Sequence, residues 1–573
     1  MFFNSIIITT NHIYIGAIYI ISGLIGGSIG FGLSIILRLE LALPGFIPCS
    51  SLQYNANITF HGIFMIFSMI MPILIGGFGN ILLPLMPCSS DMIFPRLNAL
   101  SLWLVFNSLV IIFLSMFIDG GVNAGWTSHA PSSIINYSSI DLMFFSLHIV
   151  GLSSLLGSIN SIVTLLKSTN LSIINSFLFL PPYCWSIFFT SVLLIISPPV
   201  LAGVITMIIS DRHSNRPSLD PLRGGDLLLP QHLPWFLRHP EVYISILPAF
   251  GLISEMISKF SQCIISSRDS MLIALLITAV LGCIVWGHHT FMVGFDLDTR
   301  SYLTFSTSII AIPTGIKILN WLATIRSSRF SLITPLYFII GFLFSSTFGG
   351  FTGLISANSI IDTILHDSYF IIGHLHHVLS LGAIYTISAA FYTYWIFFST
   401  ISFSDYLGRI HSGSSFISSN SISFTMHSLG IIGFPRRIYD YSMIFFKFQW
   451  FNSLGLIGIY LSIAILLFAI NLRIPLYFTL ILVNFLLVLF LIILAFHLNN
   501  IILLLNFLSI ILIILLWLLL NNIIPITLLF VLIYSSLLSI IFIMNGLLLI
   551  SPINIRYSKK GLILALTFSW LFL

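Results

Sequence analysis

Charged residues are scarce in this chain. Only 6% of its 573 residues are Asp, Glu, Lys or Arg, whereas 58% are hydrophobic. A soluble protein cannot cover its surface with so few charges, so lipid must be the solvent for most of that surface. The composition predicts an all-α polytopic membrane protein. The net charge of +5 on so long a chain gives no indication of nucleic-acid binding.

Cysteine and targeting signals are also sparse. The five cysteines have no C-x-x-C or clustered spacing, so neither a disulfide framework nor a thiolate metal site is supported. The first residues, MFFNSIIITTNH, lack the basic region of a signal peptide and the arginines of a transit peptide. We therefore expect the membrane spans themselves to direct insertion.

Long apolar runs make up most of the sequence. A membrane-spanning helix needs about 20 apolar residues. Twelve such runs, joined by short polar loops, lie at 13–37, 57–86, 97–118, 141–167, 183–210, 230–258, 270–289, 300–322, 332–356, 369–397, 415–433 and 450–471. They predict a twelve-helix core over residues 1–473. The nearly pure Leu, Ile and Phe runs of residues 474–573 predict a C-terminal extension with about three more transmembrane helices, which face lipid or partner subunits and carry no chemistry.

The loop charges do not orient these spans. Lys and Arg are divided almost equally between the side that holds the N-terminus and the opposite side, so the positive-inside rule decides nothing. Most acids, among them Asp211, Asp362 and Asp367, fall on the opposite side. That face is expected to hold charged groups.

Six histidines fall at one depth of the predicted bundle. Counting alternating spans places them near the side opposite the N-terminus: His61, His239, His288, His289, His374 and His376. A single transmembrane histidine is more often a hydrogen-bonded packing residue, but agreement among four segments favours ligands. Successive helix residues turn by about 100°, so His374 and His376 point to opposite sides of their helix. They cannot bind one metal ion, but they can serve two cofactors, with His61 completing the coordination of one.

The other histidines predict a metal site. His239 and Tyr243 are four residues apart and share one helix face. His288 and His289 are adjacent, and both can reach an ion at the end of their helix. Three neutral imidazoles suit copper well and zinc less well.

Two titratable groups lie inside predicted spans. Glu241 is two residues from His239, and in an apolar span its carboxyl is expected to take up and pass on protons. The alternative is a structural hydrogen bond at the kink of Pro240. For Lys317, the alternative to a function within the membrane is a side chain that snorkels to the interface.

Seven motifs occur together in a specific order: GGFGN, HPEVYI, VWGHH, DTRSYLTFST, IPTGIK, LHDSYFIIGHLHHVLS and FPRR. With them, roughly residues 10 to 471 resemble subunit 1 of the haem–copper terminal oxidases, and most closely the mitochondrial cytochrome c oxidases. The resemblance implies four-electron reduction of dioxygen to water with electrons from cytochrome c, coupled to proton pumping.

The resemblance also implies two haems and a copper ion. His61 and His376 would be the axial ligands of low-spin haem a, and His374 would bind the high-spin haem a. Copper B would be held by His239, His288 and His289. Tyr243 would be cross-linked to His239 and supply an electron and a proton for splitting dioxygen.

Further roles follow from the same resemblance. Arg38 would contact the formyl group of the low-spin haem, and His366 with Asp367 would contribute to a magnesium site shared with subunit 2. Haem propionates would be held by three residues, Trp126, Arg436 and Arg437. Subunits 2 and 3, accessory subunits, membrane lipid and, through subunit 2, cytochrome c would be the partners.

Two proton routes are implied from the side of the N-terminus, which would be the matrix side of the mitochondrial inner membrane. The first would run from Asp91 to Glu241 past Asn80, Asn98, Asn160, Ser153 and Ser154. The second would use Lys317 and Thr314 and end at Tyr243.

The sequence departs from the family pattern in several places. Arg238 replaces a glycine directly before a copper ligand, and we expect its guanidinium to reach water, a haem propionate or a partner acid. Leu375 replaces a phenylalanine and His377 a tyrosine. Ile438-Tyr439 stands where a serine ligand of a peripheral sodium or calcium site is expected. That site, otherwise drawn from Glu40 and Gly45, is left in doubt.

Three rival functions remain at this point. A quinol-fed oxidase shares the fold, and its donor is decided largely by subunit 2. A nitric oxide reductase also shares the fold, but its relatives lack the tyrosine at Tyr243. A haem-free proton-coupled transporter that uses the histidines as a relay belongs to another class, and an optical spectrum distinguishes it.

Overall fold

The computed structural model describes residues 9–45, 49–128, 133, 137–168, 180–214, 225, 229–327, 332–395 and 403–471. Within these ranges the chain is helical and has no strand, only one antiparallel bridge between Ser368 and Pro435. The all-α fold class is confirmed. The extension predicted over residues 474–573 lies outside the described residues, so its helices and the domain boundary at residue 473 stay predictions.

Eleven described segments are long and apolar enough to cross a membrane, which confirms a multi-pass membrane protein. They are α2 (His12–Glu40), α3 through α4 (Ser51–Leu85), α5 (Pro95–Ser115), α6 (Ser138–Ser168), α8 (Pro182–Ser214), most of α9 (Leu229–Ser261), α10 through η4 (Arg268–Val293), α11 through α12 (Leu297–Arg326), α13 (Thr334–Ala357), α15 through α16 (Tyr369–Tyr394), and η6 with most of α19 (Phe446–Asn471).

The remaining predicted span, 415–433, corresponds to α18 (Asp405–Ile431), which has 27 residues but is rich in serine. Its serine hydroxyls donate to backbone carbonyls three or four residues earlier, as Ser412 does to Arg409 at 2.8 Å and Ser423 to Ser419 at 3.0 Å. Each such bond satisfies a polar side chain locally, which a membrane helix requires. The helix can therefore lie among the other spans despite its composition.

Several spans are not regular α-helices. The second contains α3 (Ser51–Ile63), two π-helical segments η1 (Phe64–Ile70) and η2 (Pro72–Gly79), and α4 (Asn80–Leu85). Another changes from α15 (Tyr369–Leu375) to the π-helical η5 (His376–Ala383) and then to α16 (Ile384–Tyr394). Such π-helical stretches are frequent at functional sites. Here one of them begins at a predicted haem ligand.

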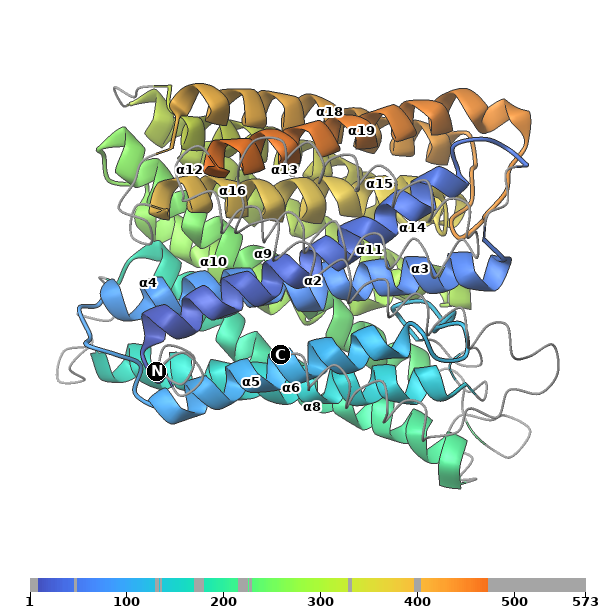
Figure 1. Cartoon of the computed structure of the whole chain (residues 1–573), viewed down its shortest axis with the longest axis horizontal. Helices are drawn as coiled ribbons and strands as arrows, with labels where there is room; N and C mark the ends of the chain where they lie inside the picture. Colours follow the sequence, from blue (N-terminus) through green and yellow to red (C-terminus); the bar gives the residue numbers. More distant parts are fainter. Residues whose placement is uncertain are drawn as a thin grey trace, which may run out of the picture. The chain divides into compact units, whose positions relative to one another are not determined.

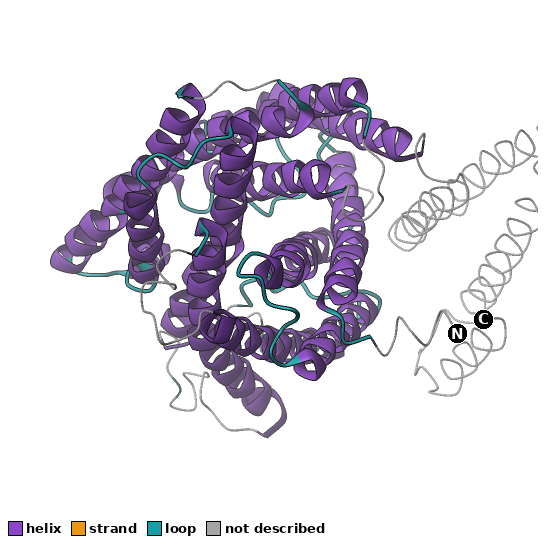
Figure 2. Cartoon of the chain, turned by 90° about the vertical axis from the view of Figure 1, so that its left-hand side faces the viewer, coloured by secondary structure: helices purple, strands orange, loops and turns teal. Residues whose placement is uncertain are grey.

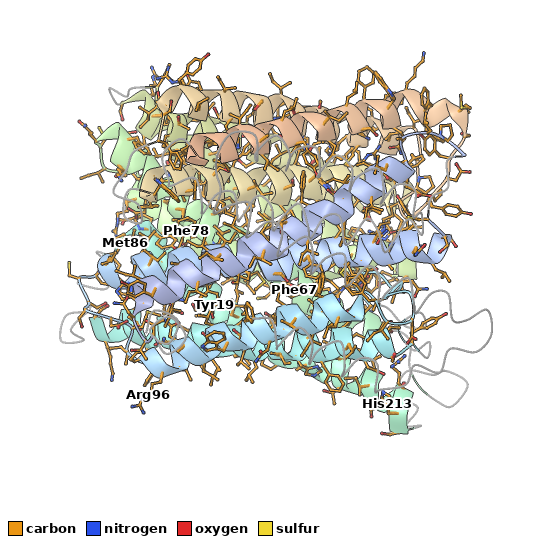
Figure 3. The ribbon with its side chains drawn as sticks, viewed as in Figure 1. Tyr19, Phe67, Phe78, Met86, Arg96 and His213 are labelled. Carbon is orange, nitrogen blue, oxygen red and sulfur yellow. The ribbon has the colours of Figure 1, made fainter. Side chains whose placement is uncertain are left out.

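The helices run side by side, as Figures 1 and 2 show from two directions. Helices α5, α6 and α8 pack in sequence along one edge of Figure 1, whereas α18 and α19 pack together along the opposite edge. In Figure 3, Met86 and Arg96 lie at one end of the bundle and His213 lies at the other. The second and fifth spans therefore end at opposite ends of the bundle, as alternating spans require.

The core lies where α8, α9, α13 and α16 meet, and it is filled by buried Leu, Ile and Phe side chains. Lipid gives such helices little hydrophobic reason to associate, so packing depends on close backbone approach. In α2, a side chain at Gly26 would lie 2.9 Å from the backbone oxygen of Ser68. Outward residues such as Phe305 and Leu319 are 68% and 67% exposed, as expected for contact with lipid.

Candidate functional site

Three imidazoles meet between α9 and η4 (Trp286–Val293). One nitrogen from each of His239, His288 and His289 lies within 4.8 Å of the other two. His239 Nδ1 and His289 Nε2 are 3.2 Å apart. Two ligands at about 2.0 Å from one tetrahedral metal ion would be about 3.3 Å apart. The geometry therefore fits an ion of copper or zinc size.

The local backbone brings these rings together. Helix α10 (Arg268–Gly282) ends earlier than the predicted span 270–289, and His288 and His289 belong to the following 3-10 segment. The indole of Trp235 stacks on His289, with ring centroids 4.2 Å apart and 13° between the planes. Nε2 of His239 is buried without a hydrogen-bond partner among the described residues. These contacts fix the rings and leave nitrogens free to bind.

Tyr243 lies next to this cluster. Its ring centroid is 4.7 Å from that of His239, in an edge-to-face arrangement. Glycine at position 282 makes room for it, because a Cβ there would lie 2.6 Å from Tyr243 Cδ2. The phenol therefore belongs to the same site as the three imidazoles.

Glu241 is 8% exposed, and its Oε1 has no hydrogen-bond partner among the described residues. The predicted alternative, a structural hydrogen bond at Pro240, is not seen for this oxygen. An unpaired carboxyl oxygen inside the membrane is unfavourable. This fits a group whose hydrogen-bond partners are water or a transferred proton.

His374 and His376 interact with different neighbours. His374 packs over Gly353 of α13, and its Nδ1 is 3.1 Å from Thr352 Oγ1. It also lies within electrostatic range of His288. His376 instead lies within electrostatic range of His61 of α3. The two rings thus interact with different neighbours, and their assignment to two cofactors stays a prediction.

Backbone contacts determine which ring nitrogen is free in His61 and His376. Nδ1 of His61 is 2.8 Å from the carbonyl of Gly30, and Nδ1 of His376 is 2.8 Å from the carbonyl of Ile372. A ring that donates its Nδ1 proton to a carbonyl presents Nε2 as the ligand atom. Both rings therefore present Nε2 as the nitrogen available for a ligand bond.

His377 lies beside these ligands and has no predicted role. It is completely buried, neither ring nitrogen has a partner among the described residues, and Phe424 and His427 pack against it at centroid distances of 5.1 and 5.0 Å. The structure gives no reason for histidine in place of the expected tyrosine.

Arg38 is held by a residue that the sequence did not indicate. Its Nη2 donates to the backbone carbonyl of Gln449 at 2.8 Å and to Gln449 Oε1 at 2.9 Å. Its Nε is buried without a partner in the described part of the chain. That free donor fits the predicted contact with a haem substituent. Gln449 gives no sequence signal because an isolated amide near a helix start is an ordinary feature.

The residues predicted to hold propionates meet at one loop. The ring of Trp126 packs 3.4 Å from the position that a Cβ on Gly62 would take, directly beside His61. Arg437 lies with its guanidinium against Gly125, whose φ of +78° and lack of a side chain leave it room. Arg436 differs, because its Nε forms an ion pair with Asp367 Oδ1 at 2.6 Å.

That ion pair joins the propionate residues to the predicted magnesium site. His366 Nδ1 lies 3.2 Å from Asp362 Oδ2, and its Nε2 lies 3.8 Å from Asp367 Oδ2. The hydrogen bond with Asp362 raises the pKa of His366, and the charges of both acids act in the same direction. Asp362, four residues before His366, is the acid that the motif alone did not single out.

The peripheral cation site retains part of its expected ligands. Glu40 accepts a hydrogen bond from the backbone of Cys49 at 3.1 Å through Oε2, whereas its Oε1 is buried without a partner among the described residues. Asp440 accepts from the backbone nitrogen of Gly45 at 2.8 Å and acts electrostatically on Glu40. Two carboxylates therefore face this site even though Tyr439 replaces the expected serine.

Water, a haem propionate and a partner acid were the three predicted contacts of Arg238, and the structure rules out water. The side chain is 6% exposed, and no acid in the described part of the chain forms an ion pair with it. Its guanidinium carbon lies 5.0 Å from the centroid of the Trp126 ring, and Nη1 has no partner within those same residues. Glu241 interacts with it only at longer range.

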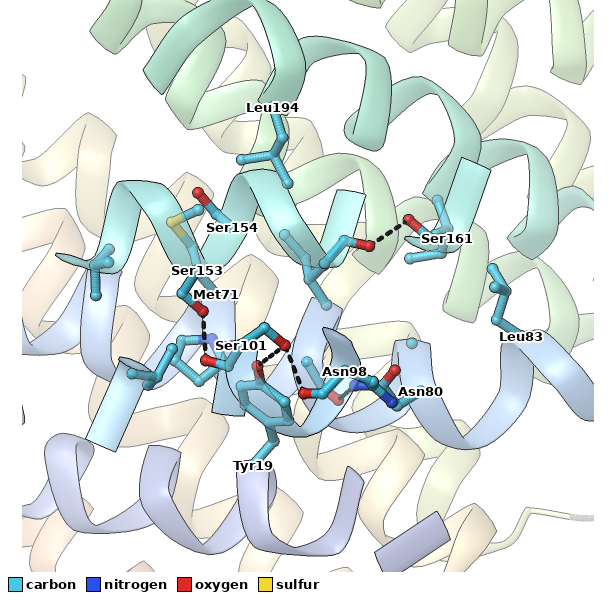
Figure 4. Close-up of a pocket in the computed structure, with 18 of the residues that line it drawn as sticks. Tyr19, Met71, Asn80, Leu83, Asn98, Ser101, Ser153, Ser154, Ser161 and Leu194 are labelled. Atoms are coloured by element: carbon cyan, nitrogen blue, oxygen red, sulfur yellow. Dashed lines mark hydrogen bonds between the residues drawn. The ribbon is translucent and has the colours of Figure 1, made fainter. Parts of the chain in front are cut away.

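A water-accessible cavity lies among α2, η2, α5, α6 and α8, with about 70 Å³ of free space. Figure 4 shows four predicted proton-route residues around it: Asn80, Asn98, Ser153 and Ser154. A buried water occupies about 30 Å³ of liquid volume, so the space suits a short water chain.

Other residues of that predicted route do not line the cavity. Asn160 bonds the backbone of Phe94 in both directions, at 3.0 and 3.3 Å, and so fixes the loop that follows Asp91. Asp91 is half-buried, and its carboxylate accepts from the nitrogen of Met92 at 2.7 Å. Neither these two residues nor Glu241 is in the cavity lining.

The structure adds Tyr19, Ser101 and Ser161 to the cavity. The hydroxyl of Tyr19 is 2.8 Å from Ser101 Oγ, and Ser153 donates to the carbonyl of Ser101 at 2.6 Å (Figure 4). Single hydroxyl residues are common in membrane helices. No sequence signal distinguishes those that line water.

Lys317 does not snorkel. It is fully buried, its ammonium group donates to Thr278 Oγ1 at 3.0 Å, and it lies 4.5 Å from the ring centroid of Phe250. Thr314, predicted for the same route, donates instead to the carbonyl of Ile310 at 2.9 Å. Thr278 gives no sequence signal because it lies on another helix.

Comparison with known proteins agrees with this geometry. The profile of the family described as "Cytochrome C and Quinol oxidase polypeptide I" matches residues 14–461. The chain is 43% identical over 460 residues to cytochrome c oxidase subunit 1 of Pecten maximus, covering 79% of this chain and 96% of the relative. It is 41% identical over 471 residues to cytochrome c oxidase subunit 1 of Candida albicans, covering 81% and 88%.

A solved structure of a heme–copper terminal oxidase dimer has the same fold. It superposes with a TM-score of 0.69 at 16% sequence identity, covering 80% of this chain and 84% of that chain.

Proposed function

This chain belongs to the family of cytochrome c and quinol oxidase polypeptide I, and we propose that it reduces dioxygen to water with four electrons from cytochrome c. Membership makes it the catalytic subunit of a terminal oxidase, an oxidoreductase that uses haem and copper. The quinol-fed alternative is not favoured, because both curated relatives are cytochrome c oxidase subunits.

The copper ion is assigned to His239, His288 and His289. The 3.2 Å separation of His239 Nδ1 and His289 Nε2 supports this assignment. His374 is assigned to the high-spin haem a, on the side of its helix that faces the copper ligands. When bound, this haem and copper supply the one-electron chemistry that dioxygen reduction needs.

Low-spin haem a is assigned to His61 and His376. The carbonyl contacts of both Nδ1 atoms support ligation through Nε2. Arg38 is assigned to a polar substituent of this haem, with its unpaired Nε as the donor. Trp126, Arg436 and Arg437 are assigned to propionates, for which guanidinium forks are well matched.

Tyr243 and Glu241 are assigned to proton delivery. The phenol of Tyr243 is beside His239, so it can hold a proton at its oxygen where the copper-binding rings meet. Glu241 is assigned to the end of the route that begins at Asp91 and passes the hydroxyl and amide groups of the cavity. Lys317 is assigned to the second route, toward Tyr243, with Thr278 holding its ammonium group.

Assembly and location complete the proposal. The chain acts in the mitochondrial inner membrane with its N-terminus on the matrix side, together with subunits 2 and 3 and accessory subunits. Cytochrome c delivers electrons through subunit 2, and protons are pumped toward the opposite side. His366 and Asp367 hold magnesium at the boundary with subunit 2.

The observation that carries this function is the placement of His374 and His376 toward two different histidine groups. It is tested by oxygen consumption of the purified complex with reduced cytochrome c and with a quinol. We expect cytochrome c to be the faster donor and His288→Asn to abolish turnover with loss of one copper per complex. Faster oxidation of quinol, or normal turnover in His288→Asn, would contradict the proposal.

A further inference from the structure

Arg238 is a cation without an explained partner. It precedes His239 on α9, one helical turn before Glu241, and is buried. The resemblance implies a glycine here, so neither the fold nor the copper site is expected to need a side chain at this position. A guanidinium has five N–H donors and stays charged in proteins, so its burial without an anion is unfavourable.

The surroundings of Arg238 indicate what kind of anion fits. Its guanidinium lies over the face of Trp126, a contact that orients the plane but satisfies no N–H group. Nη1 has no hydrogen-bond partner among the described residues. Since no acid in that part of the chain pairs with it, the partner must come from outside these side chains or from a movement of Glu241.

A second guanidinium approaches the same loop. Arg437 lies against Gly125, the residue before Trp126, while Arg436 is already paired with Asp367. Trp126 in turn packs beside Gly62, next to the predicted haem ligand His61. Arg238 and Arg437 therefore converge on Trp126 and its neighbour from two different elements. Two planar guanidinium groups at one loop match the two oxygens of a carboxylate, which each of them can bind with paired hydrogen bonds.

We propose that Arg238 binds a carboxylate of a haem propionate and acts as an additional positioning residue beside Trp126 and Arg437. The inference rests on the proposed function, because only a haem-binding chain has this ligand. The bound propionate would accept a hydrogen bond from Nη1. The guanidinium, in turn, would keep that carboxylate ionised and in one orientation. A fixed cation there also favours the reduced, less positive state of the haem whose propionate it holds.

The test uses the purified oxidase complex with haem propionates labelled with carbon-13. Redox-induced infrared difference spectra are recorded for the unmodified protein, Arg238→Met and Arg238→Lys. We expect Arg238→Met to shift the labelled carboxylate band and to lower the one-electron reduction constant of that haem about tenfold, which equals about 59 mV. Arg238→Lys should retain part of both effects because it keeps the charge.

Controls separate this role from a structural one. Arg409→Met removes an arginine whose side chain is 47% exposed and is ion-paired with Asp405, and it should change neither the band nor the potential. If Arg238→Met does not assemble, Arg238→Gly carries the same comparison, since glycine is the residue expected at this position.

Two results would overturn the proposal. The labelled band could stay unchanged in Arg238→Met while both haems are retained. Alternatively, only an unlabelled carboxyl band that disappears in Glu241→Gln could shift, which would assign Arg238 to Glu241. Absence of haem from the unmodified complex would be a different failure, that of the proposed function itself.

Discussion

At the scale of single residues, the polar groups that the membrane encloses carry the function. Glu241 is the clearest case, because its Oε1 has no partner among the described residues. We expect Glu241→Gln to lower oxygen consumption roughly 10²-fold or more, the range for loss of a positioned proton-transfer group, while both haems and the copper still assemble. Turnover is measured with reduced cytochrome c.

The same helix offers a matched control for that change. Glu255 accepts a hydrogen bond from the backbone nitrogen of Tyr183 at 3.4 Å and belongs to neither assigned route. Glu255→Gln should therefore leave turnover near normal. Near-normal turnover in Glu241→Gln as well would remove Glu241 from the proposed mechanism.

Thr278 provides a second prediction at this scale. Its hydroxyl is the one hydrogen-bond acceptor found for the ammonium group of Lys317 in the described residues. Leaving a buried polar group unpaired costs about 1–3 kcal/mol, so Thr278→Val should slow reduction of the high-spin haem roughly tenfold. Lys317→Met should slow it further. Stopped-flow reduction measures these rates.

Thr278→Ser keeps the hydroxyl and should restore the rate seen in the unmodified protein. An unchanged rate in Thr278→Val, with Lys317→Met impaired, would show that Thr278 does not position the lysine.

The residues that could be predicted were those whose chemistry is rare inside a membrane. Histidine, glutamate and lysine in apolar spans are conspicuous, and the alternation of spans is enough to place the histidines at one depth. Gln449, Tyr19 and Thr278 could not be found in this way. Each is an ordinary polar residue, and its role depends on contacts between elements far apart in the sequence.

At the scale of elements, breaks in helical regularity lie next to the proposed ligands. Helix α10 ends at Gly282, before its two ligand histidines, and η5 begins at His376. Apolar periodicity predicts the existence of these spans but not their breaks, because hydrophobicity does not distinguish α, 3-10 and π geometry. The Ser-rich α18 shows the converse, a long helix whose composition is only weakly apolar.

The contact between α18 and α15 gives a prediction at this scale. A Cβ on Gly430 would clash with the backbone of Phe370, four residues before His374. Overpacking at such a contact costs about 1–3 kcal/mol, and backbone atoms cannot move aside as a flexible side chain can. Gly430→Ala should therefore lower the temperature at which the high-spin haem band is lost.

Gly413→Ala, on the same helix, is the control, because nothing lies within 4 Å of its added Cβ. It should leave the haem band at least as stable, since alanine favours a helix over glycine. Equal effects of the two substitutions would contradict the proposed close contact at Gly430.

At the scale of the whole molecule, the arrangement of spans would hold the two proposed haem sites on opposite faces of α15 and η5. The resemblance of the core, residues 14–461 by the family profile, extends over nearly all of the described residues. The three helices predicted beyond residue 473 remain a prediction, and their expected role is to dock partner subunits without approaching the haems.

The reduced-minus-oxidised optical spectrum of the purified complex tests the central claim most directly, compared between the unmodified protein and His376→Asn. The unmodified protein should show one low-spin and one high-spin haem. His376→Asn should lose the low-spin signal and keep the high-spin one, whereas His377→Tyr should keep both. Survival of both haems unaltered in His376→Asn would contradict the assignment of His374 and His376 to different cofactors.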